Sequence, residues 1–231
     1  MRKILLATAL IGTLAVFSQN RAAADSVVLV PAPAVDEPLA KAPGTQTAIL
    51  SGGCFWGMQV VFQHVKGVRE AISGYTGGAA GTADYEDVST GTTGHAESLK
   101  IVFDPSVVSY GTLLRVYFSV AADPTELNYQ YPDHGPQYRS DIWAVNAEQR
   151  QIADAYIRQL TADHTFSAPI VTRVDSAMPF YPAESYHQNY ATLNPDSLYI
   201  SLYDAPKVTA LARLFPTLYA SQPVLVQVGS S

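Results

Sequence analysis

The sequence of 231 residues contains one cysteine, Cys54. A single thiol excludes a disulfide within the chain and any cluster that needs several sulfur ligands. The sequence also has no H-E-x-x-H pair, so we expect no metal centre. A free thiol without a structural partner is a candidate nucleophile, and a buried cysteine in a core helix is the alternative.

Positive charge is scarce, with 14 lysine and arginine residues against 20 acidic residues. This balance lacks the basic footprint of a nucleic-acid-binding protein, so we expect no nucleic-acid partner. The apolar run from Ile4 to Phe17 is short for a membrane span. Arg2 and Lys3 precede it and Ala22-Ala23-Ala24 follows it, which is the layout of a secretory signal peptide. We therefore expect cleavage near Ala24, export to the periplasm and no stable membrane insertion; a cytosolic protein with a chance apolar N-terminus is the weaker alternative.

The remaining chain divides by composition. Residues 25–46 contain four prolines among alanines and small polar residues, which predicts a flexible leader. Residues 47–216 have the apolar density of one globular domain, and residues 217–231 are expected to form a loose tail.

Periodicity predicts mixed secondary structure. Strands are expected at residues 47–51, 68–73, 85–88, 93–103, 138–145 and 170–174. Helices are expected at residues 58–65, 109–121, 147–160 and 207–214, with a further helix from Pro182 through Tyr190. Residues 74–81 and 123–137 are rich in turn residues and predict loops. The elements are intermixed without strict alternation, which favours an α+β domain with a mainly antiparallel sheet and helices packed on it.

Two glycines, Gly52 and Gly53, lie between the first strand and Cys54 and permit a tight turn there. Cys54 would then lie in the first helical turn, where the helix dipole lowers the pKa of a thiol. Phe55 and Trp56 follow directly and could form an apolar pocket around the sulfur.

Other candidate residues come from three polar segments. Glu97 enters an apolar strand, so its carboxyl group could be held neutral and donate a proton; a solvent-facing glutamate is the alternative. Asp133 and Tyr138 come from the long loop and the start of the next strand, where ordinary turn chemistry is the competing interpretation. Tyr85 is a possible hydroxyl donor or a half-buried strand tyrosine. His95 and His187 could serve the site or form core hydrogen bonds.

Four motifs together resemble a known family. They are Gly53-Cys54-Phe55-Trp56-Gly57, Gly94-His95-Ala96-Glu97, Asp133-His134-Gly135 with Gln137-Tyr138-Arg139-Ser140, and Ala183-Glu184-Ser185-Tyr186-His187-Gln188. Their order and spacing resemble the peptide-methionine (S)-S-oxide reductases, the A-type methionine sulfoxide reductases, over roughly residues 47–195. The family fold is a two-layer α+β sandwich around a mixed sheet.

The resemblance implies a role for each matching residue. Cys54 attacks the sulfoxide sulfur and becomes a sulfenic acid, while Phe55 and Trp56 receive the substrate methyl group. Glu97 donates a proton to the sulfoxide oxygen. The remaining assignments are Tyr85 and Tyr138 as hydrogen-bond donors to that oxygen, Asp133 in the recycling network, and Gly53, Gly57, His95 and His187 as the supporting shell. The implied substrate is the S epimer of methionine sulfoxide, free or in oxidised proteins, and the implied biological role is repair.

One departure from the family pattern is consequential. Many members carry further cysteines near the C-terminus that resolve the sulfenic acid, but residues 195–231 contain none. We therefore expect recycling by an external thiol, either a thioredoxin-like protein, a glutaredoxin-like protein or a small thiol, with no bound cofactor. We also expect a monomer. A Cys–His hydrolase and an exported binding module without a recycling route are the alternative functions.

Overall fold

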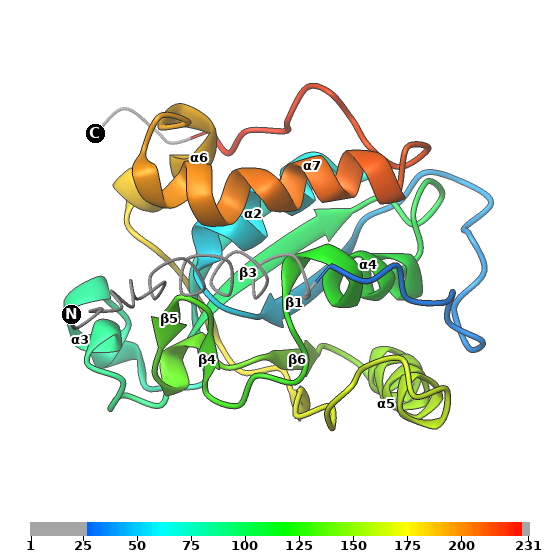
Figure 1. Ribbon diagram of the computed structural model, residues 1–231, viewed down its shortest axis with the longest axis horizontal. Helices are drawn as coiled ribbons and strands as arrows, with labels where there is room; N and C mark the ends of the chain where they lie inside the picture. The colour runs from blue at the N-terminus through cyan, green and yellow to red at the C-terminus, as the bar shows by residue number, and fades with distance from the viewer. Residues whose placement is uncertain (1–26, 228–231) are drawn as a thin grey trace, which may run out of the picture.

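A six-stranded sheet lies at the centre of the computed structural model, which describes residues 27–227 (Figure 1). The strands in spatial order are β7 (Arg173–Ser176), β6 (Asp141–Ala144), β1 (Gln46–Ser51), β3 (Ala96–Phe103), β2 (Val68–Thr76) and β8 (Phe180–Pro182). Only the β6–β7 pairing is parallel among the pairs of this sheet. The predicted mixed, mainly antiparallel sheet is therefore confirmed. The predicted signal peptide, residues 1–24, lies outside the described residues.

Helices pack on the sheet and on one another. They are α2 (Phe55–Gln63), α3 (Tyr85–Ser89), α4 (Tyr110–Val116), α5 (Ala147–Ala162), α6 (Tyr190–Leu193) and α7 (Ala205–Leu214). Helix α2 lies against β2 and β3 and is itself covered by α6 and α7, whereas α5 packs on β6, β7 and α4. Single turns link these elements at Ala80–Thr82, Tyr117–Ala121, Pro136–Tyr138, Ser185–His187 and Ile200–Asp204, and a small hairpin joins β4 (Tyr129–Gln130) to β5 (Asp133–His134).

The predicted strand at residues 85–88 is wrong, because this segment is helix α3. The Asp84 side chain accepts a hydrogen bond from the Asp87 N–H group at 3.0 Å and caps the helix. The start of the predicted glycine-rich loop is also wrong, since residues 74–76 continue β2. A Cβ atom on Gly74 would lie 2.4 Å from the carbonyl oxygen of Tyr181, so glycine permits the close approach of β8.

The helix predicted from Pro182 is wrong as well. Pro182 ends β8, and the chain then forms a single turn before α6 begins at Tyr190. The break has a physical cause, because Asn189 has a left-handed backbone with φ of 59°. In addition, the Gln188 amide donates to the carbonyl oxygens of Ser73 and Ala183 and thereby ties the chain to β2.

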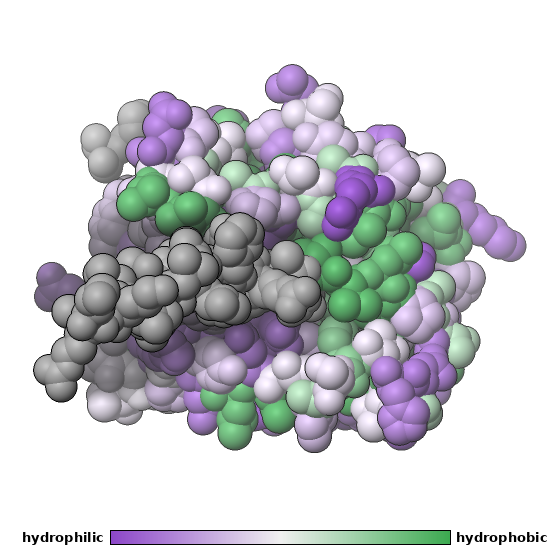
Figure 2. Space-filling model, viewed as in Figure 1, coloured by the Kyte–Doolittle hydropathy of each residue, from purple (hydrophilic) through white to green (hydrophobic). Residues whose placement is uncertain are grey.

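The predicted flexible leader is packed in the structure from residue 27 onward. Val30 is fully buried, its N–H group donates to Ser119 Oγ, and its carbonyl oxygen accepts from Arg115 Nε. Asp36 accepts from the Ser109 hydroxyl and the Gly111 N–H group at the start of α4. Composition indicated a linker, but these apolar and capping contacts attach it to α4. On the face drawn in Figure 2, apolar side chains gather between α7 and α4.

The predicted loose tail is likewise attached as far as residue 227. The N–H group of Ala220 donates to the His64 carbonyl oxygen, and that of Val224 donates to the Gln63 carbonyl oxygen. Backbone groups at the end of α2 thus find partners in the tail. Within residues 27–227, no helix is both long and apolar enough to span a bilayer.

The packing of the leader predicts that Val30→Ala destabilises the protein, because it removes two buried carbon atoms and leaves a cavity. We expect a loss of about 2 kcal/mol in the free energy of unfolding, measured by denaturant titration. Val35→Ala is the matched control, since Val35 is 43% exposed in the same segment and should change stability by less than about 0.5 kcal/mol. Equal effects of the two variants would contradict this packing.

Candidate active site

Cys54 lies at the N-terminal end of α2, directly after the turn that follows β1. Gly53 forms this turn with φ of +88°, and a Cβ atom there would lie 2.7 Å from Cβ of Gln130. The Gly53 N–H group donates to the Tyr138 carbonyl oxygen at 3.2 Å. The predicted strand–turn–helix placement of Cys54 is therefore confirmed, and glycine is required at residue 53 by both backbone conformation and space.

Glu97 lies next to this helix start. It is 4% exposed at the beginning of β3, and its Oε2 accepts a hydrogen bond from the Phe55 N–H group at 2.9 Å. Burial raises the pKa of Glu97 to about 8, against the opposing effect of that hydrogen bond. Glu97 is consequently protonated at neutral pH, as the strand position predicted.

The predicted low pKa of Cys54 is wrong for this structure. Desolvation of the half-buried thiol raises its pKa, and the nearby charges of Glu97 and Asp204 raise it further. The Trp56 N–H group at the helix start opposes this shift but is outweighed. The local sequence indicated the helix start, but it could not indicate the acidic side chains that face the thiol from other elements.

The phenols of Tyr85 and Tyr138 lie close enough to Cys54 and Glu97 for the charges of these two residues to influence them. Burial is the main cause that raises the pKa of both phenols, and the charge of Glu97 raises it further in each case. Among residues 27–227, neither hydroxyl has a hydrogen-bond partner, so both can donate to a ligand. Glu184 positions Tyr85, because its carboxylate accepts from the Tyr85 N–H group and from the Tyr75 hydroxyl, each at 2.9 Å.

The rings of Phe55 and Trp56 both lie beside His187. Their centroids are 5.0 Å and 5.7 Å from that of the imidazole. Trp56 Nε1 donates to His187 Nδ1 at 3.2 Å, and the indole stacks on Tyr190 with a centroid distance of 3.9 Å. Burial lowers the pKa of His187, so the imidazole is a neutral hydrogen-bond acceptor that fixes the indole orientation.

His95 forms hydrogen bonds with the loop at residues 78 and 79. Its Nδ1 accepts from the Gly78 N–H group at 3.2 Å, and its Nε2 lies 2.9 Å from the Ala79 carbonyl oxygen. Asp133 is half-buried in β5 and accepts a hydrogen bond from the Tyr199 hydroxyl. His95 is thus a supporting residue, whereas Asp133 belongs to the polar network near Cys54.

Sequence reasoning missed three residues of this network, Tyr199, Asp204 and Lys207, because the chain after residue 195 showed no motif. Tyr199 meets the Trp56 ring edge-on at 6.0 Å. A Cβ atom on Gly57 would lie 2.2 Å from Asp204 Oδ1, so glycine at residue 57 makes room for this carboxylate.

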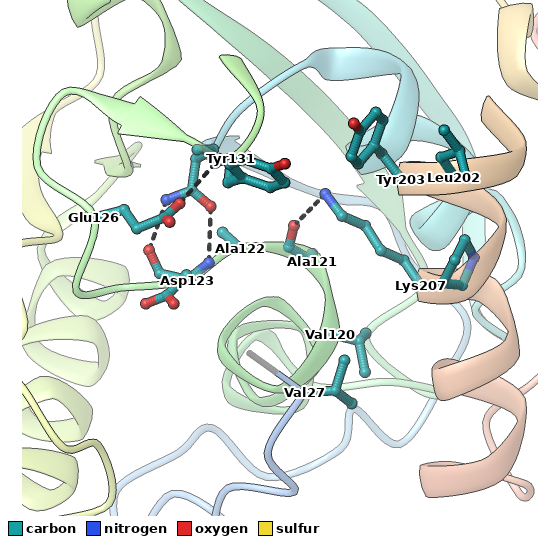
Figure 3. A pocket seen from close by; sticks show the side chains of 12 residues that line it. Val27, Val120, Ala121, Ala122, Asp123, Glu126, Tyr131, Leu202, Tyr203 and Lys207 are labelled. Carbon is teal, nitrogen blue, oxygen red and sulfur yellow. Dashed lines mark hydrogen bonds between the residues drawn. The ribbon is translucent and has the colours of Figure 1, made fainter. Parts of the chain in front are cut away.

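Lys207 borders a neighbouring cavity of about 100 Å³ between α7 and the segment 120–131 (Figure 3). Its ammonium group donates to the Ala121 carbonyl oxygen at 3.1 Å, below the rings of Tyr131 and Tyr203.

Among the described residues, no group of three or more histidine, cysteine or acidic side chains could hold a metal ion.

Comparisons with known proteins agree with this geometry. The family model "Peptide methionine sulfoxide reductase" matches residues 46–217. The chain belongs to the peptide methionine sulfoxide reductase family. It is 60% identical over 190 residues to "Peptide methionine sulfoxide reductase MsrA 2" of Mesorhizobium japonicum, covering 82% of this chain and 97% of that protein. A Synechocystis relative of the same name is 48% identical, covering 78% and 85%.

A solved structure also resembles the fold. Methionine sulfoxide reductase A of Corynebacterium diphtheriae is 31% identical, with a TM-score of 0.57, covering 74% of this chain and 89% of that one. The chain is thus an oxidoreductase that reduces methionine sulfoxide, and the general mechanism of its family passes through a cysteine sulfenic acid.

The raised pKa of Glu97 predicts a pH-dependent stability. Unfolding returns the pKa of this group toward 4.5, so the folded chain binds one more proton between about pH 5 and 8. Its contribution to stability is fully present below the unfolded pKa and is lost as the pH rises through the folded pKa. Glu97→Gln should remove this loss, worth up to about 1.4 kcal/mol per pH unit.

Denaturant titrations across this pH range measure the difference between wild type and Glu97→Gln. The exposed Glu148, changed to glutamine, is the matched control and should leave the wild-type pH dependence in place. Parallel stability curves for wild type and Glu97→Gln would contradict a neutral Glu97.

Proposed function

We propose that this protein reduces the S epimer of methionine sulfoxide, free or in oxidised proteins, with Cys54 as the nucleophile and Glu97 as the acid. The observation that carries the proposal is the juxtaposition of the only thiol of the chain with a buried, protonated carboxyl group. The Phe55 N–H group links the two, because it follows Cys54 directly and donates to Glu97.

In the first step, the sulfur of Cys54 attacks the sulfoxide sulfur while the Glu97 proton moves to the sulfoxide oxygen. The oxygen then passes to Cys54, so that methionine sulfoxide and thiol become methionine and sulfenic acid. The thiol proton restores Glu97, and the step balances without a bound cofactor. Acid assistance is needed because a negative oxygen in a desolvated pocket is costly.

Selection of the epimer requires contacts on two sides of the sulfoxide. Tyr85 and Tyr138 donate hydrogen bonds to its oxygen, and the apolar faces of Phe55 and Trp56 receive its methyl group. A methyl pocket alone discriminates by only about 1–3 kcal/mol, so the hydroxyl groups must contribute to stereoselectivity. The free hydroxyl groups of the two tyrosines and the fixed indole of Trp56 support these assignments.

Recycling uses an external thiol, for which a thioredoxin-like protein, a glutaredoxin-like protein or a small thiol qualifies. One thiol attacks the Cys54 sulfenic acid to give a mixed disulfide and water, and a second releases Cys54. Asp133 and its Tyr199 partner lie near the sulfur to support the departure of the hydroxide. A Cys–His hydrolase is disfavoured, since no histidine among the described residues forms a hydrogen bond with Cys54 and His187 accepts from Trp56.

A single-turnover reaction with racemic methionine sulfoxide tests the proposal. Mass spectrometry of Cys54 should show one added oxygen, and chiral chromatography should show loss of the S epimer only. Cys54→Ser should give no methionine, and Glu97→Gln should slow the first step by about two to three orders of magnitude. Loss of both epimers at equal rates, or full single-turnover activity of Glu97→Gln, would contradict the assignments.

We further propose that the protein is exported to the periplasm, on the grounds of the signal-like residues 1–24, and that it is a monomer. Cell fractionation with intact-mass measurement should find the mature chain outside the cytoplasm, starting at Asp25. A full-length cytoplasmic product would overturn the export proposal, and size-exclusion chromatography with light scattering tests the monomer.

A further inference from the structure

Asp204 is a buried carboxylate to which the reaction above assigns no role. Its side chain is 1% exposed, and Oδ2 has no hydrogen-bond partner among the described residues. Isolated buried charges are costly, and a structural role would be served as well by an apolar residue. This arrangement therefore requires a functional explanation.

The position of this carboxylate connects it to the reactive end of α2. Oδ1 faces the backbone of Gly57, in the first turn of the helix that begins after Cys54. The segment carrying Asp204 is held there by Tyr199, which contacts both Asp133 and Trp56. The charge of Asp204 is correspondingly one of the influences that raise the pKa of Cys54.

Neutralisation of Asp204 is incomplete. Lys207, three residues along α7, lowers the pKa of Asp204 through its charge, but its ammonium group donates to the Ala121 carbonyl oxygen, and among the described residues it forms no ion pair with Asp204. Burial raises the pKa of Asp204 to about 6, so the group carries its charge above that pH.

We propose that Asp204 is a positioning residue for Cys54: its negative charge adds to the effect of burial in keeping the thiol protonated in the resting protein. This inference rests on the proposed role of Cys54 and adds a control over its reactivity. Such a control suits a chain without a second cysteine, because a prematurely oxidised Cys54 can be restored only by an external thiol.

The other ionisable groups facing Cys54 are Glu97 from β3, Asp133 from β5, and the phenols of Tyr85, Tyr138 and Tyr199.

Alkylation of Cys54 by iodoacetamide across pH 5.5 to about 9 tests the proposal, because the alkylation rate follows the thiolate fraction. Asp204→Asn should react roughly tenfold faster than wild type near pH 8. This ratio corresponds to a pKa of the Cys54 thiol that is lower by about one in the variant. The ratio of the two rates should fall toward one below about pH 6, where wild-type Asp204 is itself neutral.

Two controls separate charge from structure. Asp204→Glu should restore slow alkylation because it keeps the charge, and Asp196→Asn, an exposed change in the same C-terminal region, should behave as wild type. Asp204→Leu replaces the asparagine variant if that protein does not fold, since an apolar side chain suits a buried position.

A rate ratio of one at every pH, or a ratio that does not vary with pH, would overturn the proposal. Alkylation needs no sulfoxide, so its outcome is independent of the single-turnover assay. Failure of Cys54 to reduce sulfoxide would therefore refute the proposed function and leave the measured influence of Asp204 on the thiol standing.

Discussion

The hydrogen bond from the Phe55 N–H group to Glu97 Oε2 is the contact on which the rest of the site depends. The donor is a backbone group at the start of α2, one of the first N–H groups that have no acceptor within the helix. The acceptor is a carboxyl group at the start of β3, a central strand of the sheet. The contact thus places Cys54, the residue before Phe55, beside the carboxyl group of Glu97 without requiring any flexible side chain as a donor. A backbone donor also keeps this geometry independent of the side chain at residue 55.

Acidic groups converge on this contact from three parts of the chain. Glu97, Asp133 and Asp204 each have a raised pKa, with burial as the largest cause in every case. Lys207 offsets this accumulation at Asp133 and Asp204, where its charge lowers the pKa. The resting site therefore retains protons on both the acid and the thiol. Such an environment disfavours a free thiolate, but it supplies the proton that a sulfoxide oxygen needs before its bond to sulfur can break.

The features that could be predicted from the sequence are those set by the residues next to them in the chain. Cys54 at a strand–turn–helix junction and Glu97 entering an apolar strand are examples, because two glycines and a period-2 pattern suffice for them. A local capping contact was misread, and features set by distant contacts were wrong or missed. Tyr85 was placed in a strand although Asp84 caps a helix there, and residues 27–46 were expected to be flexible although Val30 is buried against α4. Asp204 carried no signal, since its importance arises only from its contact with Gly57, about 150 residues earlier in the sequence.

The packing of the C-terminal segment supports the proposed recycling by an external thiol, in addition to the absence of cysteine from residues 195–231. Ile200 is 3% exposed and packs with Val60 of α2 and Ala191 of α6. Tyr199 and Asp204, on either side of this anchor, contact the site itself. A segment that delivers a resolving thiol to a sulfenic acid must detach and approach the sulfur, which requires few buried contacts. The segment in this protein is instead packed against the site, where it supplies a phenol and a carboxylate, and this packing favours the proposed attack by a thiol of another molecule.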